Sequence, residues 1–348
     1  MKIRIFVGTG GVGKTSVTAA SALRSAVDGN KALVLTIDPA LRLRSALGLT
    51  GTAFEQRVGL ESIKSIDAKG ELWAALLDVP SAMNRMVEAQ VSRDKAREIT
   101  AHPVYRLMLT SLAGMNELLA VERIRQAMAD GFENLFIDTA PSRHAFEFLD
   151  KPEFFVQLVS FPLIRLVGRT FGLWRKGRAP ADAASTDGGV YEKVEQLIGP
   201  ALAGQILEFF SIFQPVAEGY ASSARDTIGL LRDSRSAAFT IVCSPARARQ
   251  DGNYFFTELT KRGYAVEQLI VNRLWPEWDM KAAPGASEAT RELVGWYENV
   301  CAAQRAGRDK AAVAWHGKGP RVIDLPELAR NVDGIAALAS IAEHLRDR

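Results

Sequence analysis

The glycine-rich segment Gly8–Thr15 (GTGGVGKT) constrains the fold of this chain more than any other feature. It matches the pattern G-x-x-x-x-G-K-[ST] and stands between a strand-like run, Ile3–Val7, and a helix-forming stretch, Thr15–Val27. This order of elements turns backbone N–H groups around a polyphosphate at the positive end of a helix. A glycine-rich turn without a ligand is the alternative. It is disfavoured because the Lys–Thr pair and both flanking elements are in register.

Within this segment each residue type has an expected task. Lys14 would contact the β- and γ-phosphates of a nucleotide, and the hydroxyl of Thr15 would bind Mg²⁺. The other residues that we expect to bind phosphate or to line its loop are Gly10, Gly11, Val12, Gly13 and Ser16.

Short apolar runs alternate with helical stretches along the 348 residues. The runs that we interpret as strands are Ile3–Val7, Ala32–Ile37, Asn134–Ile137, Ala238–Val242 and Gln268–Val271, each followed within two residues by Gly, Asp, Ser or Asn. This alternation predicts an α/β fold, a doubly wound and mostly parallel sheet with ligands at its carboxyl edge. The whole chain, 1–348, would form one phosphate-loop domain.

Two long tracts between the predicted strands indicate helices. Apolar residues recur at helical spacing within 72–130 and again within 152–232. Both tracts are too long for simple crossovers, so we expect a helical subdomain inserted between strands. Residues 175–189, rich in Gly, Ala, Pro and Ser, would form a mobile loop within it.

Composition excludes several classes of protein. The net charge is only +3, without a long basic tract, so nothing favours a nucleic-acid partner. The two cysteines, Cys243 and Cys301, form neither a disulfide framework nor a metal clamp. Residues 154–174 are apolar, but Arg165 and Arg169 make a membrane span too costly. A cytoplasmic protein without a signal peptide is expected.

Two strand-terminal carboxylates are candidates for magnesium and catalysis. Asp138 ends the run Leu135–Asp138, beside the expected position of the phosphate loop, and could hold Mg²⁺ directly or through water. The alternative is a purely structural role, in which Asp138 caps the N-terminus of the next helix. Asp38 ends another strand and could orient water or magnesium, or simply begin an Asp-Pro turn.

Three motifs together resemble one family. Residues 8–15, Asp38–Ala40 (DPA) and Asp138–His144 (DTAPSRH) look like the phosphate loop, switch I and switch II of the arsenical-pump and tail-anchored-protein-targeting ATPases, most closely the bacterial branch called anion-transporting ATPases. The resemblance implies a deviant Walker A loop, catalytic Lys14, Asp38 and Asp138, and adenine contact by Asn272. It also implies dimers that couple ATP hydrolysis to a helical subdomain.

The chain departs from this family at two positions. Thr9 stands where the family usually has a signature lysine that reaches the partner's phosphates, and Ser45 stands where switch I usually has a second Asp. A charge supplied in trans is worth roughly 10³–10⁵ in rate, so intrinsic hydrolysis should be slow. Arg42, Arg44 or Arg143 could substitute, or the partner could be a paralogous subunit that carries the lysine. His144 matches a switch II histidine, with either a structural or a chemical role.

The remaining sequence features concern which nucleotide the protein binds and what its nucleotide cycle drives. No [NT]-K-x-D element follows the later strands, which favours ATP over GTP. Three outputs stay open: a targeting factor for hydrophobic protein clients, a pump subunit with a membrane partner, and a regulatory ATP-binding module. Neither the arsenite-binding cysteine cluster nor the zinc-binding C-x-x-C of the family is present in the sequence.

Overall fold

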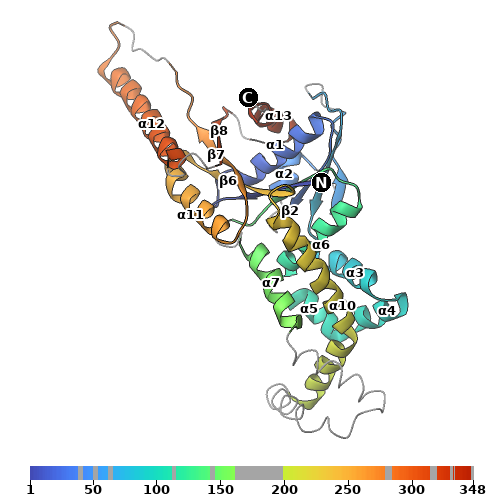
Figure 1. Cartoon of the computed structure of the whole chain (residues 1–348). Coiled ribbons are helices and arrows are strands. Elements are labelled where there is room, and N and C mark those ends of the chain that lie inside the picture. The colour runs from blue at the N-terminus through green and yellow to red at the C-terminus, as the bar shows by residue number, and fades with distance from the viewer. Residues whose placement is uncertain are drawn as a thin grey trace. The chain divides into compact units, whose positions relative to one another are not determined.

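A computed structural model gives the architecture of most of the chain (Figure 1). The residues that it describes are 1–37, 42–49, 54–61, 66–111, 115–141, 146–160, 199–278, 284–313, 320–329, 332 and 334–345. The chain divides into two compact units. Unit 1 comprises Met1–Leu76, Ala127–Ala145 and Leu230–Arg348, and unit 2 comprises Leu77–Gln126 and Phe146–Gly229.

Unit 1 is built on an eight-stranded sheet with the order β3-β4-β2-β5-β1-β6-β7-β8. Its strands are β1 (Lys2–Val7), β2 (Lys31–Thr36), β3 (Glu55–Arg57), β4 (Glu71–Leu76), β5 (Asn134–Asp138), β6 (Ala237–Cys243), β7 (Val266–Leu274) and β8 (Arg321–Pro326). All neighbouring strands pair in parallel except β3 and β4, which are antiparallel. The predicted α/β fold with a mostly parallel sheet is therefore confirmed.

Five of the eight strands were predicted from their apolar runs, and three were not. The helix predicted from residue 72 onward is wrong at its start, because Glu71–Leu76 form β4. This six-residue run (ELWAAL) contains good helix formers, and so short a run does not distinguish a helix from a strand. Pairing with β2 decides the outcome, since Lys31–Thr36 align with Glu71–Leu76 along their whole length.

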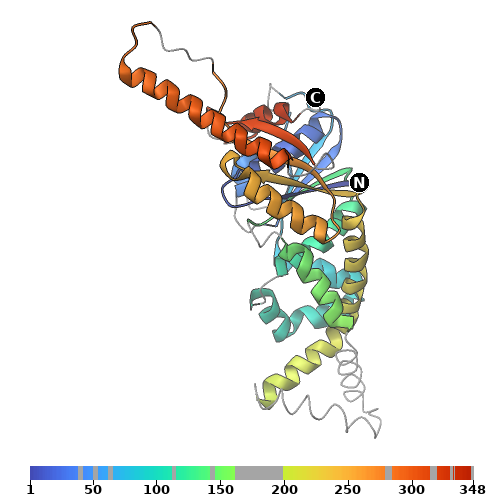
Figure 2. The same ribbon diagram turned by 60° about the vertical axis from the view of Figure 1, so that its left-hand side comes forward.

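Helices cover both faces of this sheet (Figure 2). The helices α1 (Lys14–Val27), α2 (Arg42–Leu47) and α13 (Ile335–His344) pack together on one face, and α11 (Ala248–Lys261) and α12 (Glu288–Val313) lie on the other. The chain moves in one direction along the sheet from β1 to β2 and in the opposite direction from β6 to β8. Right-handed crossovers then put the connecting helices on opposite faces and create a topological switch point between β1 and β6.

The core of unit 1 lies between the sheet and α1. Small residues on α1 are fully buried, among them Ala19, Ala20 and Ala22, so the helix approaches the strands closely. Val34 of β2 and Phe136 of β5 belong to the same hydrophobic cluster. This packing fixes the first turn of α1 above the carboxyl edge of the sheet.

All of the secondary-structure elements described in unit 2 are helices. Its helices are α3 (Val79–Gln90), α4 (Arg93–Ala101), α5 (Pro103–Ser111), α6 (Met115–Ala129), α7 (Glu147–Ser160) and α10 (Pro200–Arg232), of which α6 and α10 end in unit 1. Met83, Met86 and Val87, which recur at helical spacing along α3, are buried. On α10 the rings of Phe209 and Phe213 stack with centroids 5.1 Å apart.

Within the described part of the chain, no helix has the length and apolar character needed to cross a membrane. Most of the apolar segment 154–174, including both of its arginines, lies outside the described residues. The loop predicted at 175–189 also lies outside them.

The burial of Cys243 leads to a first prediction. This thiol, at the end of β6, is 0% exposed and donates to the Ile270 carbonyl at 3.7 Å. Burial, with a smaller contribution from the Asp251 carboxylate, raises its pKa from 9.0 to about 12. In a Cys301→Ser variant, the folded protein should therefore resist alkylation at pH 8 and react fully once unfolded in urea.

The same shift has a consequence for stability. Above pH 9 the unfolded chain loses the thiol proton while the folded chain keeps it, so this group lowers the free energy of unfolding as the pH rises towards 12. Rapid alkylation of folded Cys301→Ser protein at pH 8 would show that β6 is not buried as described.

Candidate functional site

The glycine loop connects the central strand β1 to α1, and two of its glycines are required by contacts. A Cβ atom on Gly8 would lie 2.2 Å from the Val242 carbonyl oxygen of β6. A Cβ atom on Gly13 would lie 2.4 Å from Nδ2 of Asn272, and Gly13 also has a φ of 84°. The loop thus lies against two neighbouring strands, at the carboxyl edge of the sheet.

Asn272 of β7 holds this loop. Its side-chain amide donates to the Val12 carbonyl at 2.8 Å, and the residue is only 8% exposed. Because the bond uses the carbonyl group of Val12, it does not occupy the N–H of that residue. Contact between Asn272 and adenine, which the family resemblance implies, stays a prediction, and the structure adds a role in supporting the loop.

Thr15 and Asp138 meet although 123 residues separate them in the chain. The Thr15 hydroxyl, in the first turn of α1, donates to Oδ2 of Asp138 at 2.7 Å. Asp138 ends β5 and is 1% exposed, and the Thr36 hydroxyl of β2 lies 3.4 Å from the same oxygen. A hydroxyl and a carboxylate that face each other in this way are the hard oxygen donors that Mg²⁺ prefers, and the remaining positions around the ion would be taken by phosphate and water. The residues present therefore fit a magnesium site.

The other predicted phosphate-binding residues lie along the same loop. Lys14 begins α1 and is 7% exposed, and Ser16 follows in the first turn of the helix. Gly10 and Gly11 form the exposed tip of the loop, and Gly11 has a φ of 80°. The structure thus brings all eight predicted cofactor-binding residues to the carboxyl edge of the sheet.

The structure describes some of the predicted residues of the two switch segments and not others. Asp38, Arg143 and His144 lie outside the described residues. Arg42, Arg44 and Ser45 belong to α2, where Arg42 and Ser45 are exposed and Arg44 is half-buried. In the described part of the chain, no three His, Cys, Asp or Glu side chains gather in a metal-binding cluster.

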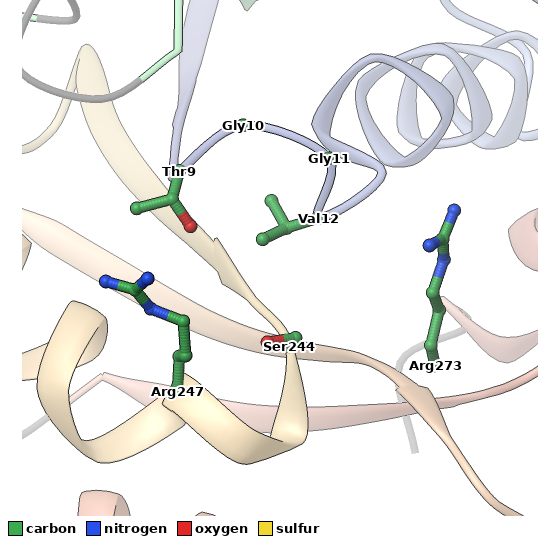
Figure 3. A pocket seen from close by; sticks show the side chains of 7 residues that line it. All are labelled: Thr9, Gly10, Gly11, Val12, Ser244, Arg247 and Arg273. Atoms are coloured by element: carbon green, nitrogen blue, oxygen red, sulfur yellow. The ribbon is translucent and has the colours of Figure 1, made fainter.

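A pocket of about 370 Å³ borders the first half of the loop (Figure 3). It is lined by Thr9, Gly10, Gly11, Val12, Ser244, Arg247 and Arg273. Ser244 and Arg247 follow β6, so the pocket opens at the switch point between β1 and β6. Sequence reasoning missed Ser244 and Arg247, and it gave no role to Arg273, which directly follows Asn272. Their positions after β6 and near the end of β7 were the available signal, since such positions lie at the ligand-binding edge of a parallel sheet.

The comparisons with known proteins agree with this geometry. The family model of the anion-transporting ATPases matches residues 1–177. The chain belongs to that family. The resemblance that we inferred from the phosphate loop and the two switch motifs is thereby confirmed.

Individual relatives extend the similarity beyond the first half of the chain. A putative arsenical pump-driving ATPase of Prosthecochloris vibrioformis is 35% identical over 44% of this chain and 36% of its own length. ATPase GET3B of Arabidopsis thaliana is 27% identical over 77% of this chain and 63% of its own. The chain thus matches less than two thirds of either relative. ATPase GET3 of Malassezia globosa is 23% identical over 97% of this chain and 88% of its own length.

The contacts of the loop predict different effects of two glycine substitutions. Gly11→Ala adds a Cβ at positive φ with no atom within 4 Å, so it should cost only the backbone strain, about 1–2 kcal/mol. Gly13→Ala adds the same strain and also displaces Asn272 from Val12, so we expect a further loss of about 1–3 kcal/mol. Urea unfolding followed by circular dichroism would measure the difference. Equal losses for both variants would contradict the proposed support by Asn272.

Proposed function

We propose that the protein is a Mg²⁺-dependent ATPase that works as a dimeric switch. The observation that carries the proposal is the hydrogen bond of 2.7 Å between Thr15 and Asp138, directly beside a loop that ends in Lys14. A loop of this kind is built to receive phosphate groups, and a hydroxyl–carboxylate pair is suited to the metal ion that accompanies them.

The residues of the site would act by positioning and electrostatics. The N–H groups of the loop and the N-terminus of α1 would bind the β-phosphate, and Lys14 would place its charge on the β- and γ-phosphates. The Thr15 hydroxyl and the Asp138 carboxylate would hold Mg²⁺, which when bound neutralises charge on the phosphate oxygens. Asp38, in switch I, would orient the attacking water.

We propose ATP as the nucleotide. The sequence lacks the [NT]-K-x-D element whose carboxylate recognises guanine, and Asn272 lies next to the loop with a side chain able to contact an adenine edge. Since Thr9 carries no charge, hydrolysis by the chain alone would be slow.

The dimer and its output belong to the same proposal. We infer a homodimer, or a heterodimer with a paralogous ATPase, located in the cytoplasm, in which unit 2 transmits the nucleotide state to a hydrophobic protein client or a membrane-protein partner. Unit 2 exposes the large apolar side chains of Leu107, Phe154 and Phe210, which supports a client. A regulatory ATP-binding module and a pump-associated subunit remain the alternatives, and isolation of the protein with its native partners would distinguish them.

Substitutions of the loop lysine and of the strand carboxylate test the nucleotide site. Lys14→Ala should abolish ATP binding measured by calorimetry, because a charge-assisted contact to phosphate is lost. Asp138→Asn should keep ATP binding but remove its enhancement by Mg²⁺. Lys261→Ala, a change of an exposed lysine on α11, is the control and should leave the affinity unchanged. Unchanged ATP affinity in Lys14→Ala would refute the assignment.

Nucleotide choice provides a separate test. In competition against a fluorescent ATP analogue, ATP should bind at least several-fold more tightly than GTP. The reason is that the sequence lacks the [NT]-K-x-D carboxylate that would recognise guanine. Equal displacement by the two nucleotides would contradict the choice of ATP without affecting the assignment of the phosphate loop.

A further inference from the structure

Two arginines border the pocket beside the glycine loop, and neither belongs to the switch segments. Figure 3 shows Arg247 on the side of Thr9 and Arg273 on the side of Gly11 and Val12, with Ser244 between them. Both arginine side chains are more than half exposed, with values of 55% and 56%. The pocket thus combines two cations with the exposed backbone of a phosphate loop.

Arg247 is held in place by a buried carboxylate. Nη2 and Nε of Arg247 donate to Oδ1 of Asp251 at 3.0 and 3.2 Å, and the Thr9 hydroxyl donates to Oδ2 of the same residue at 2.8 Å. The side chain of Asp251 is only 5% exposed, and leaving such a carboxylate without its cation would be costly. The Arg247 side chain is therefore oriented beside Thr9. Its Nη1 and one N–H of Nη2 form no hydrogen bond within the described part of the chain and can bind a ligand.

Arg273 is placed by a strained backbone. Its φ of 66° makes it the one residue other than glycine with positive φ in the described part of the chain. The pairing of β7 with β8 shifts register between Val271 and Leu274, around this residue. Such a conformation is strained and persists where the surroundings impose it. Here the bulge lets Asn272 bind the Val12 carbonyl while Arg273 lines the pocket.

Among the residues that the structure describes, the carboxylates near these arginines leave the pocket cationic towards a ligand. Asp251 is buried and both of its oxygens are occupied by Thr9 and Arg247. Glu327 lies 3.9 Å from Nε of Arg273, and both side chains are more than two fifths exposed. An exposed ion pair at that distance is weak, so a stronger anion can displace Glu327 from Arg273.

We propose that Arg247 and Arg273 form a clamp that binds the phosphate groups of the nucleotide, and that Asp251 and Thr9 position Arg247 for this task. A guanidinium group is suited to binding phosphate, since its planar array of donors matches the phosphate oxygens. This clamp rests on the proposed function and supplies the positive charge that Thr9 lacks. The phosphates are either those of the chain's own nucleotide or those of a nucleotide held by a second copy of the chain.

Binding of inorganic tripolyphosphate and of ATP, measured by calorimetry with Mg²⁺, tests the clamp. Arg247→Ala and Arg273→Ala should each weaken both ligands about tenfold, whereas Arg249→Ala, a change of an exposed arginine on α11 outside the pocket, should leave both affinities within twofold. Arg247→Lys should recover part of the loss, because it restores the charge but not the planar array of donors.

Thermal unfolding separates these effects from loss of structure. A folded Arg247→Ala variant with lower phosphate affinity supports the clamp. If that variant does not fold, Arg247→Gln, which keeps a polar side chain, replaces it in the same measurement. Wild-type affinity in both arginine variants would overturn the clamp, while loss of binding in Lys14→Ala would still support the nucleotide site. A wild-type protein that binds neither ligand would refute both proposals.

A mixing experiment distinguishes the two sources of phosphate. The Lys14→Ala chain keeps Arg247 but has lost its own nucleotide site. If Arg247 binds the phosphates of a second copy, adding this chain to the Arg247→Ala chain should restore ATP affinity. If Arg247 binds the phosphates of its own chain, the affinity should stay at the level of Arg247→Ala alone. Either result supports the clamp and identifies which nucleotide it binds.

Discussion

The parallel register between β1 and β5 is the constraint on which the site depends. In that register Phe6 lies opposite Asp138, so the chain that leaves β1 enters the glycine loop beside the carboxylate that ends β5. The loop leads into α1, and the hydroxyl of Thr15, the second residue of this helix, donates to Asp138. A slip of one residue would turn the carboxylate to the other face of the sheet and separate it from the hydroxyl. The hydrophobic contacts of α1 with the sheet hold this alignment.

Around this alignment, polar side chains from later strands support the loop from outside. Asn272 of β7 fills the space that Gly13 leaves without a side chain, and Asp251 of α11 accepts a hydrogen bond from the Thr9 hydroxyl. Both supporting residues are buried, where a hydrogen bond that is broken leaves an unsatisfied polar group at a cost of about 1–3 kcal/mol. The loop is therefore held by interactions with β6, β7 and α11, besides its own glycine conformations.

Membership of the anion-transporting ATPase family gives these contacts a context. The family resemblance implies a lysine at position 9, and this chain has a threonine whose hydroxyl is bonded to Asp251. The same carboxylate orients Arg247 at the pocket. Where the family has a lysine, this chain therefore has Thr9 hydrogen-bonded to Asp251, which also holds Arg247. This arrangement is a physical reason to propose that Arg247 supplies the positive charge that Thr9 lacks.

The errors of prediction have physical causes. Residues 72–76 were expected to be helical because Leu, Trp and Ala occur in helices as well as in strands. They form a strand because they pair with β2. The strands β3 and β8 are three and six residues long and lack a continuous apolar run. Arg247 was missed because nothing in its local sequence differs from an ordinary exposed arginine. Its importance comes from Asp251 and Thr9, which the fold brings to it.

The sequence by itself determined the phosphate loop, the alternation of strands and helices, and the carboxylate at the end of β5. These features are local, because glycine conformations, apolar runs and strand ends are encoded within a few neighbouring residues. The tertiary structure decided which strand ends became neighbours. Strand order depends on pairing between distant segments, such as β1 with β5, which are more than 100 residues apart. The same fold brings Thr15 to Asp138 and Thr9 to Asp251. Thr15 and Asp138 could be singled out because each belongs to a local sequence motif, whereas nothing in the local sequence of Arg247 marked it for the pocket.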